Sequence, residues 1–251
     1  MSPTVAGAAT LHTTHGAHDR LFYSSIGIVM AMIVVIGFSP TYYLRGYFGA
    51  PPTLSGTKAL TPLMHVHATL FTSWVLLFIL QTTLIATRRV AVHRTLGVAG
   101  VALAACMVVV GLVTAVEAAG RGAAPPGIDP LAFMVVPFFD VLLFGSFVTA
   151  ATLKRRDKEA HKRLMVLAYV CIITAGVARL PGVVAFGPLA FFGLSFLVVV
   201  AGIVYDRISR GHVHRAYVWG LTILVLSVPV RLALSGTAVW RSLATTLVNA
   251  I

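Results

Sequence analysis

Seven long apolar runs follow one another along the 251-residue chain, separated by charged residues, prolines and glycines. A helix rises about 1.5 Å per residue, so about 20 apolar residues cross a hydrocarbon layer of roughly 30 Å. None of the runs alternates polar with apolar residues, which excludes membrane-spanning strands. The pattern therefore predicts seven transmembrane helices, over Leu21 to Tyr43, Leu63 to Thr87, Thr95 to Ala119, Leu131 to Leu153, Leu164 to Leu180, Val183 to Tyr205 and Ala216 to Ser235.

The composition agrees with a membrane protein. Hydrophobic residues make up 58% of the chain and charged residues 10%, and the mean hydropathy is +0.93. A water-soluble globular protein carries about 25% charged residues. The fold class expected is an all-α integral membrane bundle of seven transmembrane helices over 21–235. A polar segment over 1–20 is expected to be a flexible cytoplasmic tail, and 236–251 a short interfacial helix.

Arginine and lysine indicate how the bundle lies in the membrane. Thirteen of them belong to the side of the bundle that holds the N-terminus, and four to the opposite side. Because such residues accumulate in cytoplasmic loops, the N-terminus is expected inside the cell and the C-terminus outside. The net charge of +12 comes from short clusters between apolar spans. Such clusters match a lipid bilayer as partner, and no nucleic acid is expected.

Histidine begins each helix that starts on the predicted cytoplasmic side, at His18, His93, His161 and His214. Imidazole is a common ligand of metals and of haem iron, so some of these side chains are candidates for a cofactor site. The alternative is that they anchor helix ends in the headgroup region. Four helices share a depth here without having to face a common axis, which favours anchoring.

Ionisable residues also occur within the predicted outer half of the spans, at Glu117, Asp140, Arg179 and Arg231. Charged groups within a membrane usually face the interior of the bundle and find partners there. They suggest an outward-facing polar pocket that binds a metal ion, a quinone head group or a haem propionate, for which the arginine fork is suited. The alternative is an ion network that only holds helices together.

The segment PLMHVHATLF, residues 62–71, adds two histidines to this region. Residues two apart on a helix point about 200° from each other, so His65 and His67 share one ion only if the helix unwinds. Pro62 is able to relax that first turn, and both histidines are therefore kept as metal-ligand candidates. His65 is the first choice for the pocket because a polar stripe of Thr69, Thr72 and Ser73 continues its face. His67 is the second, since it shares its face with Phe71, Trp74 and Phe78.

Three stretches carry a resemblance to a known group of proteins. They are HATLFTSWVLLFILQTTLIATRRV at 67–90, HRTLG at 93–97 and HKRLM at 161–165. With these the chain resembles uncharacterised bacterial multi-span proteins that carry a domain of unknown function and are distantly similar to assembly factors of haem-copper oxidases. The resemblance implies a bacterial inner-membrane protein, haem or copper as cofactor, and a respiratory-complex or homo-oligomeric partner. It also marks His93 and His161.

Two functions are consistent with these features. The first is a membrane protein that binds haem or a metal ion, in electron transfer or respiratory oxidase assembly. The alternative is a transporter, channel or sensor with a polar intramembrane pocket. A phosphate loop, a nucleophile elbow, a CxxC pair and a zinc-protease helix are all missing from the sequence, so no enzyme class is predicted.

Overall fold

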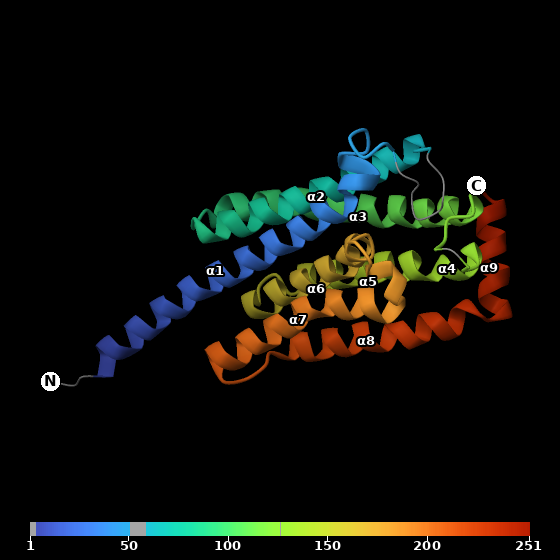
Figure 1. The fold of residues 1–251 in the computed structure, drawn as a ribbon. Helices are drawn as coiled ribbons and strands as arrows, with labels where there is room; N and C mark the ends of the chain where they lie inside the picture. Colours follow the sequence, from blue (N-terminus) through green and yellow to red (C-terminus); the bar gives the residue numbers. More distant parts are fainter. Residues whose placement is uncertain (1–3, 51–58, 126) are drawn as a thin grey trace.

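The computed structural model describes the backbone of residues 4–50, 59–125 and 127–251, and side chains from residue 18 onward within these ranges. All regular structure in the described residues is helical (Figure 1). The long helices are α1 Thr4–Phe38, α2 Pro62–Ala86, α3 Val90–Gly120, α5 Val135–Leu153, α6 Lys158–Val177, α7 Pro188–Arg210 and α8 Arg215–Ser235. Four shorter elements are the π-helical turn η1 Ser39–Tyr43, α4 Pro130–Phe133, the 3₁₀ turn η2 Val183–Phe186 and α9 Ala238–Asn249.

The seven long helices confirm the predicted number of spans, and the protein is a multi-pass membrane protein. Each has the length and the apolar composition needed to cross a membrane. The connection between α6 and α7 is longer than predicted. Helix α6 ends at Val177 and α7 begins at Pro188, with η2 between them. Gly182 and Gly187 flank η2 with φ values of 78° and 76°, a region that favours glycine, and Gly187 separates η2 from α7.

Helix α6 lies at the centre of the bundle. In the most apolar 18-residue stretch of α6, 67% of the residues are buried. The corresponding share in the other six spans is 17 to 39%. It contacts α1, α5, α7 and α8. Two glycines allow its closest contacts, because a β carbon at Gly37 of α1 would lie 2.3 Å from the carbonyl oxygen of Gly176. One at Gly220 of α8 would lie 2.2 Å from Leu167.

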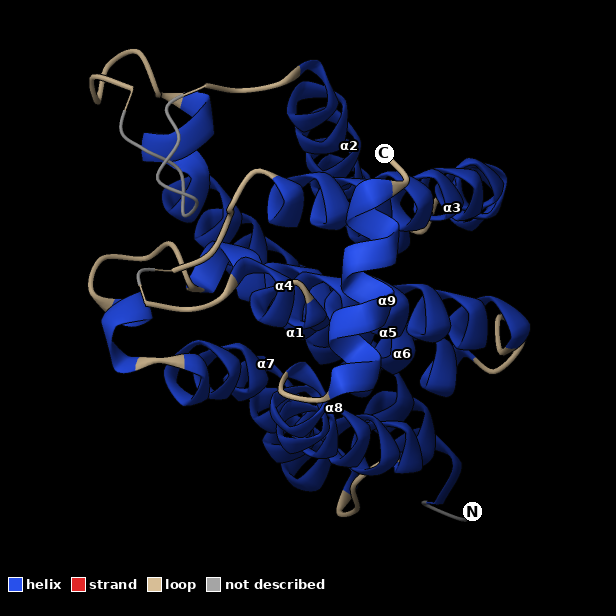
Figure 2. Ribbon diagram, turned by 90° about the vertical axis from the view of Figure 1, so that its right-hand side faces the viewer, coloured by secondary structure: helices blue, strands red, loops and turns tan. Residues whose placement is uncertain are grey.

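The two ends of the bundle differ in composition. We call the end that holds the turns at 87–89, 154–157 and 211–214 the basic end, because Arg88, Arg89, Lys154, Arg155 and Arg156 lie in these turns. We call the other the α9 end. Helix α9 crosses it at a steep angle to α8 (Figures 1 and 2). The indole nitrogen of Trp240 fixes α9 by donating to the carbonyl oxygen of Leu131, at 2.8 Å.

The N-terminal segment differs from the flexible tail predicted over 1–20. Helix α1 begins at Thr4 and runs without a break into the first span. Residues 4–20 include four alanines, which have the highest helix propensity, beside four threonines and two glycines, which favour a helix less. Extending an existing helix also requires no new nucleation, which explains why the polar sequence stays helical. Residues 1–3 lie outside the described part of the chain.

Candidate functional site

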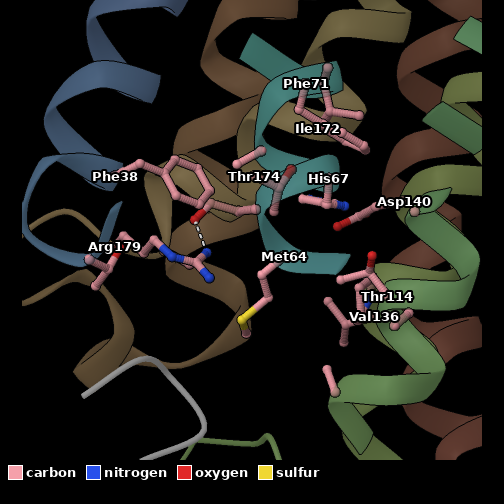
Figure 3. A pocket seen from close by; sticks show the side chains of 18 of the residues that line it. Phe38, Met64, His67, Phe71, Thr114, Val136, Asp140, Ile172, Thr174 and Arg179 are labelled. Carbon is pink, nitrogen blue, oxygen red and sulfur yellow. Dashed lines mark hydrogen bonds between the residues drawn. The ribbon is translucent and has the colours of Figure 1, made fainter. Parts of the chain in front are cut away.

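A cavity of about 300 Å³ lies in the half of the bundle near the α9 end. Its walls come mainly from α1, α2, α3, α5 and α6, and most of the lining is apolar, including Phe38, Phe71 and Phe191. Polar side chains that line it include His67, Asp140 and Arg179 (Figure 3). This combination of apolar walls and a few polar groups is typical of a small-molecule site. We call it the chamber.

His67 is the histidine that faces the chamber. Its ring stacks on Phe71 with centroids 4.0 Å apart, which fixes its direction along α2. The Nδ1 atom is buried and has no hydrogen-bond partner among the described residues. Figure 3 shows the ring directed toward the carboxylate of Asp140. An unpaired buried nitrogen is costly, so this atom is available for a ligand.

His65 lies outside the chamber, which reverses the predicted preference for it over His67. Its side chain is exposed and its Nδ1 lies 3.2 Å from the hydroxyl of Tyr42. The two histidines point in different directions because helix α2 is not unwound at Pro62. The predicted metal site made of His65 and His67 is therefore not formed by this arrangement.

The polar stripe that continues the face of His65 misled the prediction. Thr69 donates its hydroxyl to the carbonyl oxygen of His65, and Ser73 donates to that of Thr69, both at 2.8 Å. A serine or threonine that bonds to the carbonyl four residues earlier needs no partner inside the bundle. Thr69 and Ser73 therefore do not mark the inward face, whereas Thr72 lines the chamber and its hydroxyl lies 2.8 Å from that of Tyr43. The aromatic residues beside His67 pack against neighbouring helices and mark it instead.

Asp140 and Arg231 form an ion pair in the wall of the chamber. Arg231 Nη1 lies 2.5 Å from Asp140 Oδ1, and both residues are buried. Arg231 Nη1 also donates to the carbonyl oxygen of Val136 at 3.4 Å. The Nε atom of Arg231 is buried and has no partner among the described residues. The pair joins α5 to α8, and its hydrogen bonds are incomplete.

Arg179 follows the end of α6 and reaches into the chamber from the side of α1 (Figure 3). One Nη donates to the carbonyl oxygen of Ala175 at 2.7 Å, and the guanidinium lies 4.4 Å from the ring centroid of Phe38. No acidic side chain in the described part of the chain pairs with it. The guanidinium therefore presents N–H groups to any molecule in the chamber.

Glu117 does not join these residues. It pairs with Arg121 at 3.5 Å and accepts a hydrogen bond from Thr61 at 3.4 Å. It is not among the residues that line the chamber. Thr61 is the N-cap of α2, so this contact ties the start of α2 to the end of α3. Glu117 has a local structural contact rather than a place in the predicted pocket.

The four histidines at helix starts do not converge on one point. His93 and His161 are neighbours, with ring centroids 6.4 Å apart. His214 caps α8, accepting a hydrogen bond from Ala216 through Nδ1 at 3.1 Å. Burial and the nearby Arg163 lower the pKa of His214, which keeps it neutral as this cap requires. His18 is exposed. The shared position of the four histidines along the membrane normal therefore did not predict which of them lie next to each other.

A second ion network lies at the basic end and was not predicted. Arg163 and Asp206 have no exposed side-chain surface and pair through two hydrogen bonds of 2.8 and 2.5 Å. Around them the network links α1, α6 and α7 with three acidic and three basic side chains, Asp19, Glu159, Asp206, Lys162, Arg163 and Arg210. The feature of the sequence that could have predicted this network is the acidic residues Asp19 in α1 and Asp206 in α7, since the charged residues near them are mostly basic.

Within the described residues, no group of three or more histidine, cysteine, aspartate or glutamate side chains is arranged to hold a metal ion. The chamber therefore offers a single imidazole, a carboxylate and a guanidinium rather than a closed metal site. No protein-family model matches the chain, no curated protein matches its sequence, and no solved structure matches its fold.

Proposed function

We propose that the protein binds a quinone, or another lipid-soluble ring with carbonyl oxygens, in the chamber, as part of electron transfer in a bacterial inner membrane. One observation carries this proposal: His67 Nδ1 and the guanidinium of Arg179 both lie in an apolar intramembrane cavity without partners that would saturate them. A quinone carries two carbonyl oxygens, each of which accepts a hydrogen bond. Its apolar ring and tail match the aromatic walls.

The polar groups have distinct roles in this proposal. His67 donates from Nδ1 to one carbonyl oxygen, and Arg179 donates to the other. Asp140 lies across from His67, where its carboxylate is able to accept a proton from the reduced form (Figure 3). Arg231 pairs with Asp140, which favours the carboxylate form. These assignments explain why four ionisable groups are held in a part of the bundle where each is expensive.

The shape of the bundle favours binding over transport. Toward the basic end, the helices that line the chamber continue into a packed core that includes Met30, Phe78, Leu167 and Tyr169. These side chains are buried and close the chamber on that side. A transport pathway needs access from both membrane surfaces, and this packed core supports binding over transport.

Haem is the other cofactor that the sequence suggested. Arg179 suits a propionate, and His67 offers one axial nitrogen. Among the described residues that line the chamber, however, His67 is the only histidine. A quinone needs no axial ligand and fits the donors present. An absorption band in the Soret region of the purified protein would show bound haem and would favour haem over a quinone as the ligand.

The test compares two histidines that are two residues apart. Full-length protein in lipid nanodiscs is titrated with a short-tailed benzoquinone, and the dissociation constant is measured for wild type, His67→Ala and His65→Ala. Loss of a buried hydrogen bond to a ligand costs about 1–3 kcal/mol, so His67→Ala should weaken binding roughly tenfold to a hundredfold. His65→Ala should bind as wild type does. Equal weakening in both variants, or no binding by wild type, would contradict the proposal.

A further inference from the structure

His93 and His161 approach each other at the basic end, far from the chamber along the helices. His93 lies in the first turn of α3 and His161 in the first turn of α6. Their ring centroids are 6.4 Å apart and the ring planes meet at 86°. Both side chains are half-buried. Two imidazoles from separate helices are therefore held at a fixed spacing near the membrane surface.

The spacing equals that of two imidazoles on opposite sides of one metal ion. A metal–nitrogen bond measures about 2 Å, and a ring nitrogen lies about 1.1 Å from its centroid. Two opposed ligands therefore place their centroids roughly 6 Å apart. Rings at a tetrahedral angle would lie nearer, at about 5 Å. The observed separation of 6.4 Å is nearer to the value for two opposed ligands than to that for a tetrahedral pair.

The hydrogen bonds of His161 are those of a metal ligand. Its Nδ1 lies 2.8 Å from the carbonyl oxygen of Ala151, at the end of α5. A carbonyl oxygen only accepts, so Nδ1 carries a proton, and in the neutral ring Nε2 then has the lone pair. Histidines that bind metals commonly donate their other ring N–H to such an oxygen, which fixes the ring and its tautomer.

His93 and its neighbour Gln81 leave two buried polar atoms without partners. Gln81 Nε2 donates to the carbonyl oxygen of His93 at 3.3 Å. The Oε1 atom of Gln81 and the Nδ1 atom of His93 are both buried and have no hydrogen-bond partner in the described part of the chain. Unsatisfied buried polar atoms are rare in folded proteins, and His93 Nδ1 is therefore available to a ligand.

We infer that His93 and His161 bind one Cu(I) ion between them. Cu(I) accepts two opposed nitrogen ligands, whereas zinc sites use three or four protein ligands. No third histidine, cysteine or acid of the described residues joins the pair. Arg94 follows His93 in α3, and its charge repels the single charge of Cu(I) less than it would repel a divalent ion. This site is independent of the chamber.

The experiment is an anaerobic titration of the full-length protein in detergent with Cu(I), in competition with a chromogenic chelator. All variants carry His12→Ala, His15→Ala and His18→Ala, so that the N-terminal histidines contribute no background. The parent should bind one Cu(I) per chain. His93→Ala and His161→Ala should each weaken binding at least a hundredfold. Retained tight binding in either variant, or no stoichiometric binding by the parent, would overturn the inference.

Two further variants separate ligation from folding. His212→Ala is the matched control, because His212 lies at the same end and its Nδ1 also bonds to a carbonyl oxygen, that of Arg210. It should bind as the parent does, and a hundredfold loss there would contradict the site. His161→Met supplies a thioether, which Cu(I) accepts, and should restore much of the affinity, whereas His161→Phe should not. Equal affinities of the Met and Phe variants would also reject ligation by residue 161.

Discussion

The two ends of the bundle hold buried charges in different ways. At the basic end, Arg163 and Asp206 make two short hydrogen bonds to each other, and Arg163 also donates to Glu159. At the α9 end, Asp140 and Arg231 share one short contact, and Arg231 Nε has no described partner. The first arrangement satisfies its members within the protein. The second leaves the Nε–H of Arg231 without a described partner. A complete set of hydrogen bonds is typical of a structural network, whereas an incomplete set is typical of a site that binds a ligand.

Removing one member of the complete network should have the largest effect on stability. Asp206→Ala leaves Arg163 buried and deprives it of both short hydrogen bonds, and breaking such a pair costs about 3–5 kcal/mol. We expect a strongly lowered Tm or loss of folded protein, measured by thermal unfolding in detergent. A change of Tm within a few degrees would show that the basic end does not hold α6 and α7 together.

The contact between α1 and α6 should have an intermediate effect. Gly37→Ala places a methyl group against the carbonyl oxygen of Gly176, and such overpacking typically costs about 1–3 kcal/mol. Because Val34 and Phe38 on either side line the chamber, quinone binding should weaken as well. Gly46→Ala is the control, since its methyl group meets nothing within 4 Å. Equal Tm values for the two variants would mean that this contact does not position α1.

The incomplete pair at the α9 end should have the smallest effect on stability and a clear one on binding. Asp140→Asn removes the charge and keeps an oxygen that accepts from Arg231. We expect a smaller loss in the free energy of unfolding than in Asp206→Ala, because Asn keeps a hydrogen bond to Arg231, together with weaker quinone binding. The measurements are thermal unfolding and the titration used for His67→Ala. If stability falls as far as in Asp206→Ala, the pair is structural and the two ends are alike.

The sequence pattern predicted where the helices lie along the chain better than it predicted which face of each helix turns toward the interior of the bundle. That Asp140 turns inward and finds a charged partner followed from the rule for charges in a membrane, whereas the choice of Arg231 over Arg179 did not. The choice between His65 and His67 did not, because Thr69 and Ser73 satisfy their hydroxyls within their own helix. Glu117 found a nearer partner in Arg121. Short-range bonds of this kind cannot be separated from long-range ones by residue type.

The sequence by itself determined the all-helical class, the seven spans and most of their ends. Each apolar run is long enough to cross the hydrocarbon layer as a helix. Backbone N–H and C=O groups find no water in lipid, so a continuous apolar run satisfies them by forming a helix. Only the tertiary structure decided which helices meet, that α6 lies at the centre, and that His93 faces His161 while His18 and His214 lie apart. The rotation of each helix about its axis is set by packing with its neighbours, through contacts such as that of Gly37 with Gly176, and such packing has no signature in a single run of sequence.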